Sequence, residues 1–347
     1  MRLRISTFFR RPHSMPNEIM IEVTHRCNLD CTFCFNKLYI KRGEHRRELD
    51  TSSVKQIIDK IKISGVKIVR FTGGEPLLRD DIFELMAYAH GKKLKVWLNT
   101  NATLITRHNV GNIVKYVDNV LVPLNAYNSK DEEEITGKNS FNSKIRGILL
   151  LKKNGIKYLR CGTVATKENI YNLEKFHHLV KEIGFSSWEL FRVIPLPKQP
   201  APLNNEDVEN LIEKLIKINH NSKSNYKIAN AIPFCAYEPE KVSRVAWGAV
   251  FDDGHSRFVI DPKGDARPMY YLLEDIGNIF QSDILRIWNS RFMKEMRMLR
   301  YVSEECKGCK YIKMCKGGSI IASKIVKGNY KELDYLAQPS KYRYSLK

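Results

Sequence analysis

Short apolar runs alternate with amphipathic patterns along the first two thirds of the chain. Residues 52–65, 81–92 and 169–183 repeat apolar positions at helical spacing. Apolar runs typical of buried strands lie at 18–23, 67–74, 94–101, 119–126, 158–166 and 187–195. Regular alternation indicates parallel strands with right-handed crossovers, in a barrel or a doubly wound sheet. Six such units favour the barrel, so we predict an α/β fold built on a partial (β/α)6 TIM-like barrel.

The pattern changes after residue 195, where prolines interrupt the chain. A turn at Pro262–Gly264 divides the segment 256–268 and predicts a β-hairpin, and 282–299 has helical spacing. We therefore expect a small C-terminal domain made of a β-hairpin and helices. The predicted boundaries are 15–200 for the barrel core, 201–229 for a linker and helix, 230–320 for the C-terminal domain and 321–347 for a tail.

The net charge adds a clue about partners. The chain has 58 Lys and Arg against 38 Asp and Glu, a formal charge of +20. Such a charge attracts polyanions, acidic peptides or membrane surfaces, or reflects lysines scattered over solvated helices. The basic residues form no dense or aromatic-interleaved block, which argues against a nucleic-acid partner. No apolar run suits a membrane span or a secretory signal, so we expect a cytoplasmic protein with no membrane partner.

The cysteines point to two metal sites. Six of the eight fall in two clusters, at positions 27, 31 and 34 and at positions 306, 309 and 315, whereas Cys161 and Cys235 stand alone. In a reducing cytoplasm, clustered cysteines are metal ligands or catalytic groups far more often than disulfides. The second of these sites would lie in the small C-terminal domain.

The first cluster supplies three thiols and no fourth. The spacing C-x3-C-x2-C lets Cys27, Cys31 and Cys34 ligate three irons of a cubane, which leaves the fourth iron open to another molecule. A zinc site completed by His25 or Asp30 is the alternative.

This stretch resembles the signature of the radical S-adenosylmethionine (SAM) superfamily. Phe33 precedes the last cysteine, and the next predicted strand ends in "TGGEP" at 72–76, like the GGE motif of that superfamily. The resemblance implies a [4Fe–4S] cluster on Cys27, Cys31 and Cys34, with SAM bound at the open iron. It further implies that Gly73, Gly74 and Glu75 lie along the methionyl group of SAM and that Phe33 lies near its adenine.

Further SAM contacts follow from the same resemblance. Asn101 ends the strand expected to meet the ribose, and Asn125 follows Pro123, which replaces a serine of the family pattern. The carboxylate of SAM would be met by Arg160 or Arg192. Of these two, Arg192 is retained as the candidate site residue.

The second cluster has the spacing C-x2-C-x5-C at Cys306, Cys309 and Cys315. Alone it could be a zinc knuckle. After a radical-SAM core it is similar to the SPASM or twitch extension, which carries auxiliary [4Fe–4S] clusters. The full pattern of seven cysteines is truncated here, because Met269 and Ser319 stand where cysteines are expected. The resemblance therefore implies one auxiliary [4Fe–4S] cluster.

The fourth ligand of that cluster stays open at this point. Candidates are Cys235, a carboxylate such as Glu332 or Asp334, or an open coordination position for substrate. Cys235 could instead donate a hydrogen atom to a substrate radical, or be a buried thiol with no chemical role. Cys161 lies in the middle of a predicted strand, and we expect it in the core.

The resemblance implies an enzyme that makes a 5′-deoxyadenosyl radical and abstracts hydrogen from a peptide or protein, for crosslinking or epimerisation. The alternatives are a small-molecule substrate such as a tetrapyrrole or cofactor precursor and, more remotely, an iron–sulfur electron carrier or RNA-binding protein without activity. A reductant such as ferredoxin or flavodoxin would be needed. Only 26 residues precede Cys27, so we expect an acidic leader to be bound by the basic surface or a separate partner.

Overall fold

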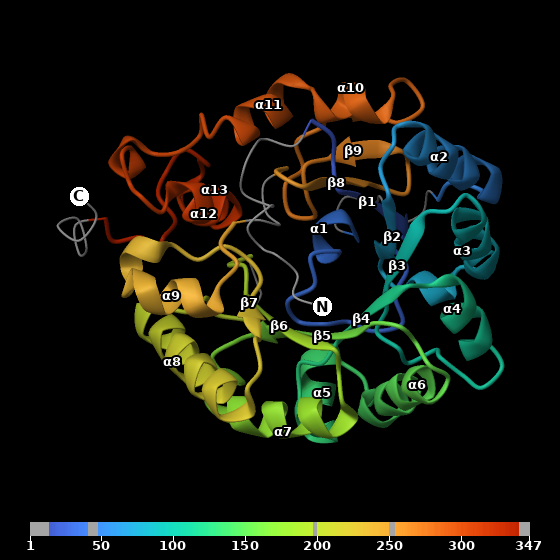
Figure 1. The fold of residues 1–347 in the computed structure, drawn as a ribbon, viewed down its shortest axis with the longest axis horizontal. Coiled ribbons are helices and arrows are strands. Elements are labelled where there is room, and N and C mark those ends of the chain that lie inside the picture. The colour runs from blue at the N-terminus through green and yellow to red at the C-terminus, as the bar shows by residue number, and fades with distance from the viewer. Residues whose placement is uncertain (1–13, 41–47, 197–199, 250–253, 340–347) are drawn as a thin grey trace.

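The strands of the structure form one continuous, mostly parallel sheet. The computed structural model describes residues 14–40, 48–196, 200–249 and 254–339. In these residues the sheet has ten strands in the order β10-β9-β8-β1-β2-β3-β4-β5-β6-β7, and it curves into a partial barrel (Figure 1). The strands are β1 (Glu18–Thr24), β2 (Ile68–Gly73), β3 (Lys95–Asn99), β4 (Asn119–Pro123), β5 (Leu159–Ala165), β6 (Ser187–Arg192), β7 (Lys227–Ile228), β8 (Arg257–Ile260), β9 (Asp265–Arg267) and β10 (Gly277–Asn278). The predicted fold class is confirmed.

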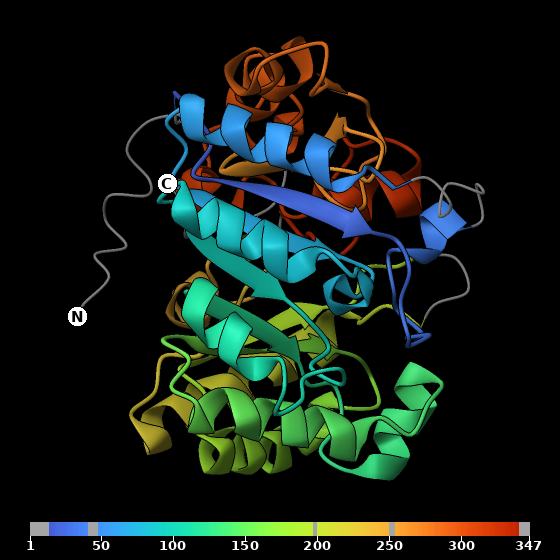
Figure 2. The ribbon, with the colours of Figure 1, turned by 90° about the vertical axis from the view of Figure 1, so that its right-hand side faces the viewer.

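Helices surround the outer face of this sheet, as Figures 1 and 2 show. Those of the barrel are α2 (Thr51–Ile63), α3 (Ile82–Gly91), α4 (Val110–Tyr116), α5 (Ser129–Thr136), α6 (Phe141–Lys153), α7 (Leu173–Ile183) and α8 (Asn205–Ser222). A short helix, α1 (Lys37–Ile40), follows the first cysteine loop. The C-terminal part adds α9 (Pro239–Val245), α10 (Ile284–Trp288), α11 (Arg291–Arg297), α12 (Ile312–Cys315) and α13 (Ile320–Lys327).

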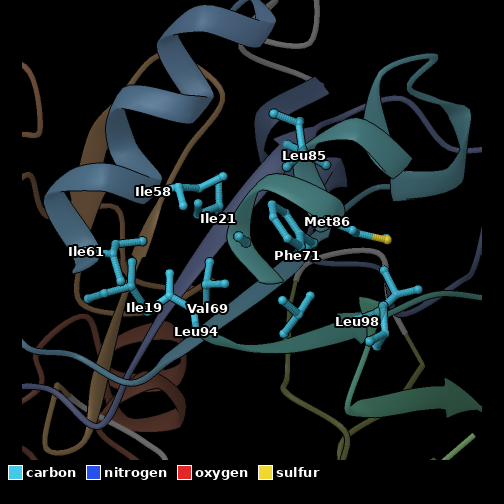
Figure 3. Packing of buried hydrophobic residues seen from close by; sticks show 14 of the residues in the cluster. Ile19, Ile21, Ile58, Ile61, Val69, Phe71, Leu85, Met86, Leu94 and Leu98 are labelled. Carbon is cyan, nitrogen blue, oxygen red and sulfur yellow. The ribbon is translucent and has the colours of Figure 1, made fainter. Parts of the chain in front are cut away.

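Successive side chains of a strand point to opposite faces of the sheet, which explains how helices cover the outer face. Ile19 and Ile21 of β1 point to the helices and pack in one buried cluster with Ile58 and Ile61 of α2 (Figure 3). The residues between them therefore point to the inside of the barrel. Burial of these apolar side chains, worth roughly 1.5–3 kcal/mol each, holds the helices on the sheet.

The inside of the barrel carries charged pairs toward the N-terminal ends of the strands. Arg70 donates to Glu18 at 2.8 Å, and Arg160 donates to Glu189 at 2.8 Å. The ring of Trp97 on β3 lies between them, with its centroid 4.6 Å from the Arg70 guanidinium and 5.3 Å from that of Arg160. Ion pairs satisfy these charges where water is scarce.

The C-terminal residues continue the barrel sheet. Strand β8 pairs in parallel with β1, and β9 and β10 extend the same edge by antiparallel pairing. Phe258 and Ile260 of β8 share one core with β1 and β2. Helix α8, in the expected linker, shares one buried cluster with β6, to which Leu211 and Trp188 belong. The domain boundaries stay predictions. Of the predicted tail, 321–347, the last residues, 340–347, lie outside the described residues.

Candidate functional site

The first cysteine loop leaves the C-terminal end of β1. Cys27 is exposed, Cys31 and Cys34 are partly buried, and all three are free thiols. The backbone of this loop is anchored to α5, because Asp30 N–H donates to the Thr136 carbonyl and Thr32 N–H to the Ile135 carbonyl, both at 2.9 Å. Four main-chain groups of the loop and helix end are thereby satisfied.

The two glycines of the TGGEP segment bring β2 against this loop. Gly74 N–H donates to the Thr24 carbonyl at 2.7 Å, and Glu75 N–H donates to the Arg26 carbonyl at 2.8 Å. A Cβ atom on Gly73 would lie 2.2 Å from the Thr24 oxygen, and one on Gly74 would lie 2.1 Å from the Arg26 oxygen. Gly73 also has φ of 128°. Only glycine permits this approach, so the motif positions the cysteine loop.

Glu75 is fully buried and accepts three hydrogen bonds. Its carboxylate receives the Thr100 hydroxyl and the Asn101 N–H, each at 2.7 Å, and the Leu77 N–H at 3.1 Å. Burial raises the pKa of Glu75 to about 7, against the lowering effect of these donors. The Asn101 side chain in turn donates to Asn28 of the cysteine loop at 2.8 Å. Glu75 and Asn101 are thus brought together beside the cysteine loop.

The other predicted SAM contacts are more dispersed. Phe33 is partly buried and packs against the second core cluster. Asn125 is buried, and its side-chain oxygen accepts the Val164 N–H at 2.8 Å. Arg192 is buried and forms a bidentate ion pair with Asp334 of the C-terminal segment. The end of β6 is thereby tied to the C-terminal segment.

Sequence reasoning missed a buried ion pair beneath the loop. Lys144 of α6 pairs with Glu132 of α5, and both side chains are at most 1% exposed. The positive charge of Lys144 lowers the pKa of the Cys31 thiol, against the larger raising effect of burial. The sequence did contain a sign of this burial. Lys144 lies one helical turn before Ile148 and two turns before Leu151, so it shares the buried face of α6 with them.

The first loop also contacts the C-terminal hairpin. The ring of Phe35 stacks on Tyr270 with centroids 4.5 Å apart and meets Tyr271 edge-on at 5.8 Å. The Tyr270 hydroxyl donates to Thr72 of β2 at 3.2 Å. Met269, where the sequence pattern lacks a cysteine, immediately precedes these tyrosines. The hairpin thus closes over the region that follows Cys34.

The chemistry of the first loop fits an iron–sulfur cluster. Burial first, and the neighbouring Cys34 next, raise the pKa of Cys31 to about 12, and burial raises that of Cys34 to about 11. Without metal these thiols therefore keep their protons, and a cluster that bound the soft sulfurs would replace those protons. His25 bonds to Glu22 at 3.4 Å and Asp30 pairs with Lys37 at 2.9 Å, so both proposed zinc ligands are engaged.

The second cysteine cluster lies on η6 (Glu304–Cys306), the loop after it and α12. Phe234 N–H, one residue before Cys235, donates to the Cys315 sulfur at 3.4 Å. Ser319 caps α13 by accepting the Ala322 N–H at 3.4 Å. Within the described residues, no three His, Cys, Asp or Glu side chains converge on a point where one ion could sit. A cubane differs, because each of its ligands meets a separate iron.

The isolated Cys161 follows its prediction. It is fully buried on β5 and belongs to the apolar cluster between the sheet and its helices. Its thiol therefore packs as a small apolar group.

Two protein-family models match the chain. The Radical SAM superfamily model matches residues 21–183, and the SPASM model, an iron–sulfur cluster-binding domain, matches residues 253–310. The first covers the cysteine loop and the TGGEP segment, and the second covers the hairpin and Cys306 and Cys309. Across the described ranges, no helix has the length and apolar character needed to cross a membrane.

Individual relatives match most of the chain. An AdoMet-dependent heme synthase of Oleidesulfovibrio alaskensis is 25% identical over 315 residues, which covers 85% of this chain and 80% of the relative. The mycofactocin maturase MftC of Mycolicibacterium smegmatis is 25% identical over 331 residues, 92% of this chain and 82% of the relative. The crystal structure of Streptococcus suis SuiB bound to the precursor peptide SuiA covers 94% of this chain and 76% of SuiB, with a TM-score of 0.76. Its identity is 21%, so this likeness concerns the fold.

Proposed function

Because the chain is a radical SAM enzyme with a C-terminal SPASM domain, we propose that it abstracts a hydrogen atom from a peptide or protein. The radical SAM domain implies a SAM-binding [4Fe–4S] cluster and SAM as cofactors, and the SPASM domain implies auxiliary iron–sulfur binding. When bound, the reduced cluster and SAM supply a 5′-deoxyadenosyl radical that attacks a C–H bond. A small electron carrier such as ferredoxin or flavodoxin would reduce the cluster.

In this proposal the chain's own residues hold and position the cofactors. Cys27, Cys31 and Cys34 would bind three irons and leave the fourth to SAM. Gly73 and Gly74 fix the loop against β2, and Glu75 locks it to the end of β3. The remaining proposed SAM contacts are Phe33, Asn101, Asn125 and Arg192. Arg192 donates to Asp334 through its two terminal nitrogens, and its buried Nε has no hydrogen-bond partner among the described residues.

The peptide substrate is supported chiefly by the likeness to the peptide maturase MftC over 92% of the chain. The fold shared with SuiB, solved with its precursor peptide, agrees with it. The charge of +20 also favours an acidic peptide leader.

A second candidate is a tetrapyrrole substrate, which the likeness to the heme synthase of Oleidesulfovibrio alaskensis favours. Propionate side chains of such a molecule would also be attracted by a basic enzyme. The two candidates therefore differ in the chemistry of the reacting C–H bond rather than in the cofactors.

The test compares the two candidate substrates in separate reactions of the anaerobically reconstituted full chain. It receives dithionite, SAM and either a short peptide encoded beside its gene or an iron porphyrin with propionate side chains. We expect substrate-dependent 5′-deoxyadenosine with the peptide, together with a peptide that has lost two hydrogen atoms or has gained deuterium from heavy water. The Cys31→Ala variant is the control and should give neither product. Turnover of the porphyrin alone would establish the second candidate.

A further inference from the structure

We propose that Cys235 is the fourth ligand of the auxiliary iron–sulfur cluster, with Cys306, Cys309 and Cys315. The cluster would then be closed by four thiolates drawn from two segments about seventy residues apart in sequence. This inference concerns the metal site alone and holds whether the substrate is a peptide or a tetrapyrrole.

The backbone beside Cys235 contacts the second cysteine cluster directly. Cys235 is the central residue of η5 (Phe234–Ala236). Phe234 N–H donates to the Cys315 sulfur at 3.4 Å, and the Phe234 ring lies 5.6 Å from that of Tyr311. The Tyr311 hydroxyl then donates to Glu240 of α9 at 2.7 Å. The segment from η5 to α9 therefore lies along α12, and Figure 1 shows these helices side by side.

Exposure shows where the thiols point. Residues 231–237 are buried except for Cys235, which is partly exposed. On the other side, residues 304–310 are exposed except for Cys306 and Cys309, which are partly buried. Cys235, Cys306 and Cys309 are therefore all partly accessible, at the boundary between a buried segment and an exposed one. A thiol that served only as a core apolar group would be buried with the rest of its segment.

The thiols also act on one another electrostatically. Burial first, and Cys235 next, raise the pKa of Cys306 to about 12. Burial likewise raises the pKa of Cys315, with Cys235 and Cys306 adding to the effect. Cys309 raises the pKa of Cys235 in the same way, after burial. These thiols therefore lie close enough for their charges to interact.

The competing oxygen ligands are engaged or turned away. Asp334 is 1% exposed, and both of its oxygens accept from Arg192. The same oxygens also accept the Ser319 N–H at 2.8 Å and the Leu336 N–H at 3.1 Å. Glu332 is exposed to solvent. Of the fourth-ligand candidates, Cys235 alone presents an uncommitted soft donor to the other three cysteines.

Main-chain N–H groups support a thiolate at these positions. Cys315 accepts from Phe234, and Cys235 receives a backbone hydrogen bond from Gln338 of the C-terminal segment. Hydrogen bonds to ligand sulfurs stabilise a reduced cluster and raise its reduction potential. A closed, hydrogen-bonded cluster has no open iron for substrate, which assigns it to electron transfer.

The experiment uses the full chain with Cys27, Cys31 and Cys34 replaced by alanine, which removes the SAM cluster. Iron and sulfide are counted after anaerobic reconstitution, and the dithionite-reduced sample is examined by electron paramagnetic resonance. We expect about four irons per chain in this background. Adding Cys235→Ala should lower the count to about three or fewer, with loss of the [4Fe–4S] signal.

Two further variants make the result decisive. Cys161→Ser removes the other isolated cysteine and should leave the iron count and spectrum unchanged. Cys235→Ser is nearly isosteric, so it keeps the fold if the alanine variant aggregates, and its oxygen ligand should shift the resonance. Unchanged iron and an unchanged spectrum in either Cys235 variant would overturn the proposal, as would one zinc in place of iron. None of these readouts needs a substrate, so a wrong proposal for the function would leave them intact.

Discussion

Glu75 joins three segments of the chain through one buried carboxylate. Its bonds to Thr100, Asn101 and Leu77 tie the end of β2 to the end of β3. Its own N–H holds the cysteine loop through Arg26. Glu75 therefore links the cysteine loop, which its main chain holds, to the end of β3, which its buried carboxylate holds.

That coupling predicts a pH effect on the metal-free chain. Folded Glu75 keeps its proton up to about pH 7, whereas the unfolded residue loses it near its ordinary value of 4.5. Between these values the folded chain binds more protons, so the free energy of unfolding should fall as pH rises, by up to about 3 kcal/mol. Urea unfolding from pH 4 to pH 8 measures this slope. Glu75→Gln should remove this part of the slope, and exposed Glu182→Gln should not.

The pair formed by Lys144 and Glu132 gives a second prediction. Replacing Lys144 with methionine leaves Glu132 buried without a countercharge, which should cost about 3–5 kcal/mol of unfolding free energy. Because both residues underlie the cysteine loop, iron bound per chain should fall as well. Lys153→Met, an exposed position on the same helix, is the matched control. Equal stabilities for the two variants would contradict the importance of the ion pair.

At the scale of elements, the end of β2 acts as a template for the loop after β1. Phe33 and Phe35 anchor the side chains of the loop, and main-chain bonds to Gly74, Glu75 and the end of α5 fix its backbone. Neither β2 nor the cysteines alone would define the site.

Because the end of β2 contacts the loop so closely, one added methyl group at Gly74 should lower both stability and iron binding. In Gly74→Ala the new Cβ would overlap the Arg26 carbonyl, and the displaced loop should cost about 1–3 kcal/mol and lose most of its iron. Gly111 lies in α4 with open space around its Cα, so Gly111→Ala should be neutral or slightly stabilising. Parallel iron assays and thermal unfolding distinguish the two. Full iron loading of Gly74→Ala would show that the loop tolerates displacement.

The elements of the barrel could be read from the sequence because their periodicity is set by local burial. The six strand patterns correspond to β1 through β6, and the cysteine spacing indicated both clusters. The parallel pairing of β8 with β1 could not be predicted, since it joins residues more than 230 positions apart. The position of Cys235 beside Cys315 and the pair of Arg192 with Asp334 are also long-range contacts that local patterns do not encode.

For the whole molecule, the excess of basic residues sets how partners approach. Long-range attraction by a charge of +20 accelerates association and is screened within about 10 Å at 0.1 M salt. If the substrate carries an acidic leader, the dissociation constant of the leader should rise with ionic strength, because the Debye length falls from about 30 Å at 0.01 M to about 10 Å at 0.1 M salt. Fluorescence anisotropy of a labelled leader measures this. A version with Asn and Gln in place of Asp and Glu should bind weakly and show little dependence on salt.

The stacking of Trp97 between two arginines has a practical consequence. Indole emission shifts with the charges around the ring. Trp97 and Trp247 are partly exposed, whereas Trp188 and Trp288 are buried in apolar clusters. A ligand carboxylate that drew Arg70 or Arg160 away from the indole ring would change the emission wavelength and intensity of Trp97. The barrel thus contains a native fluorophore, through which entry of a substrate could be followed in real time without any label.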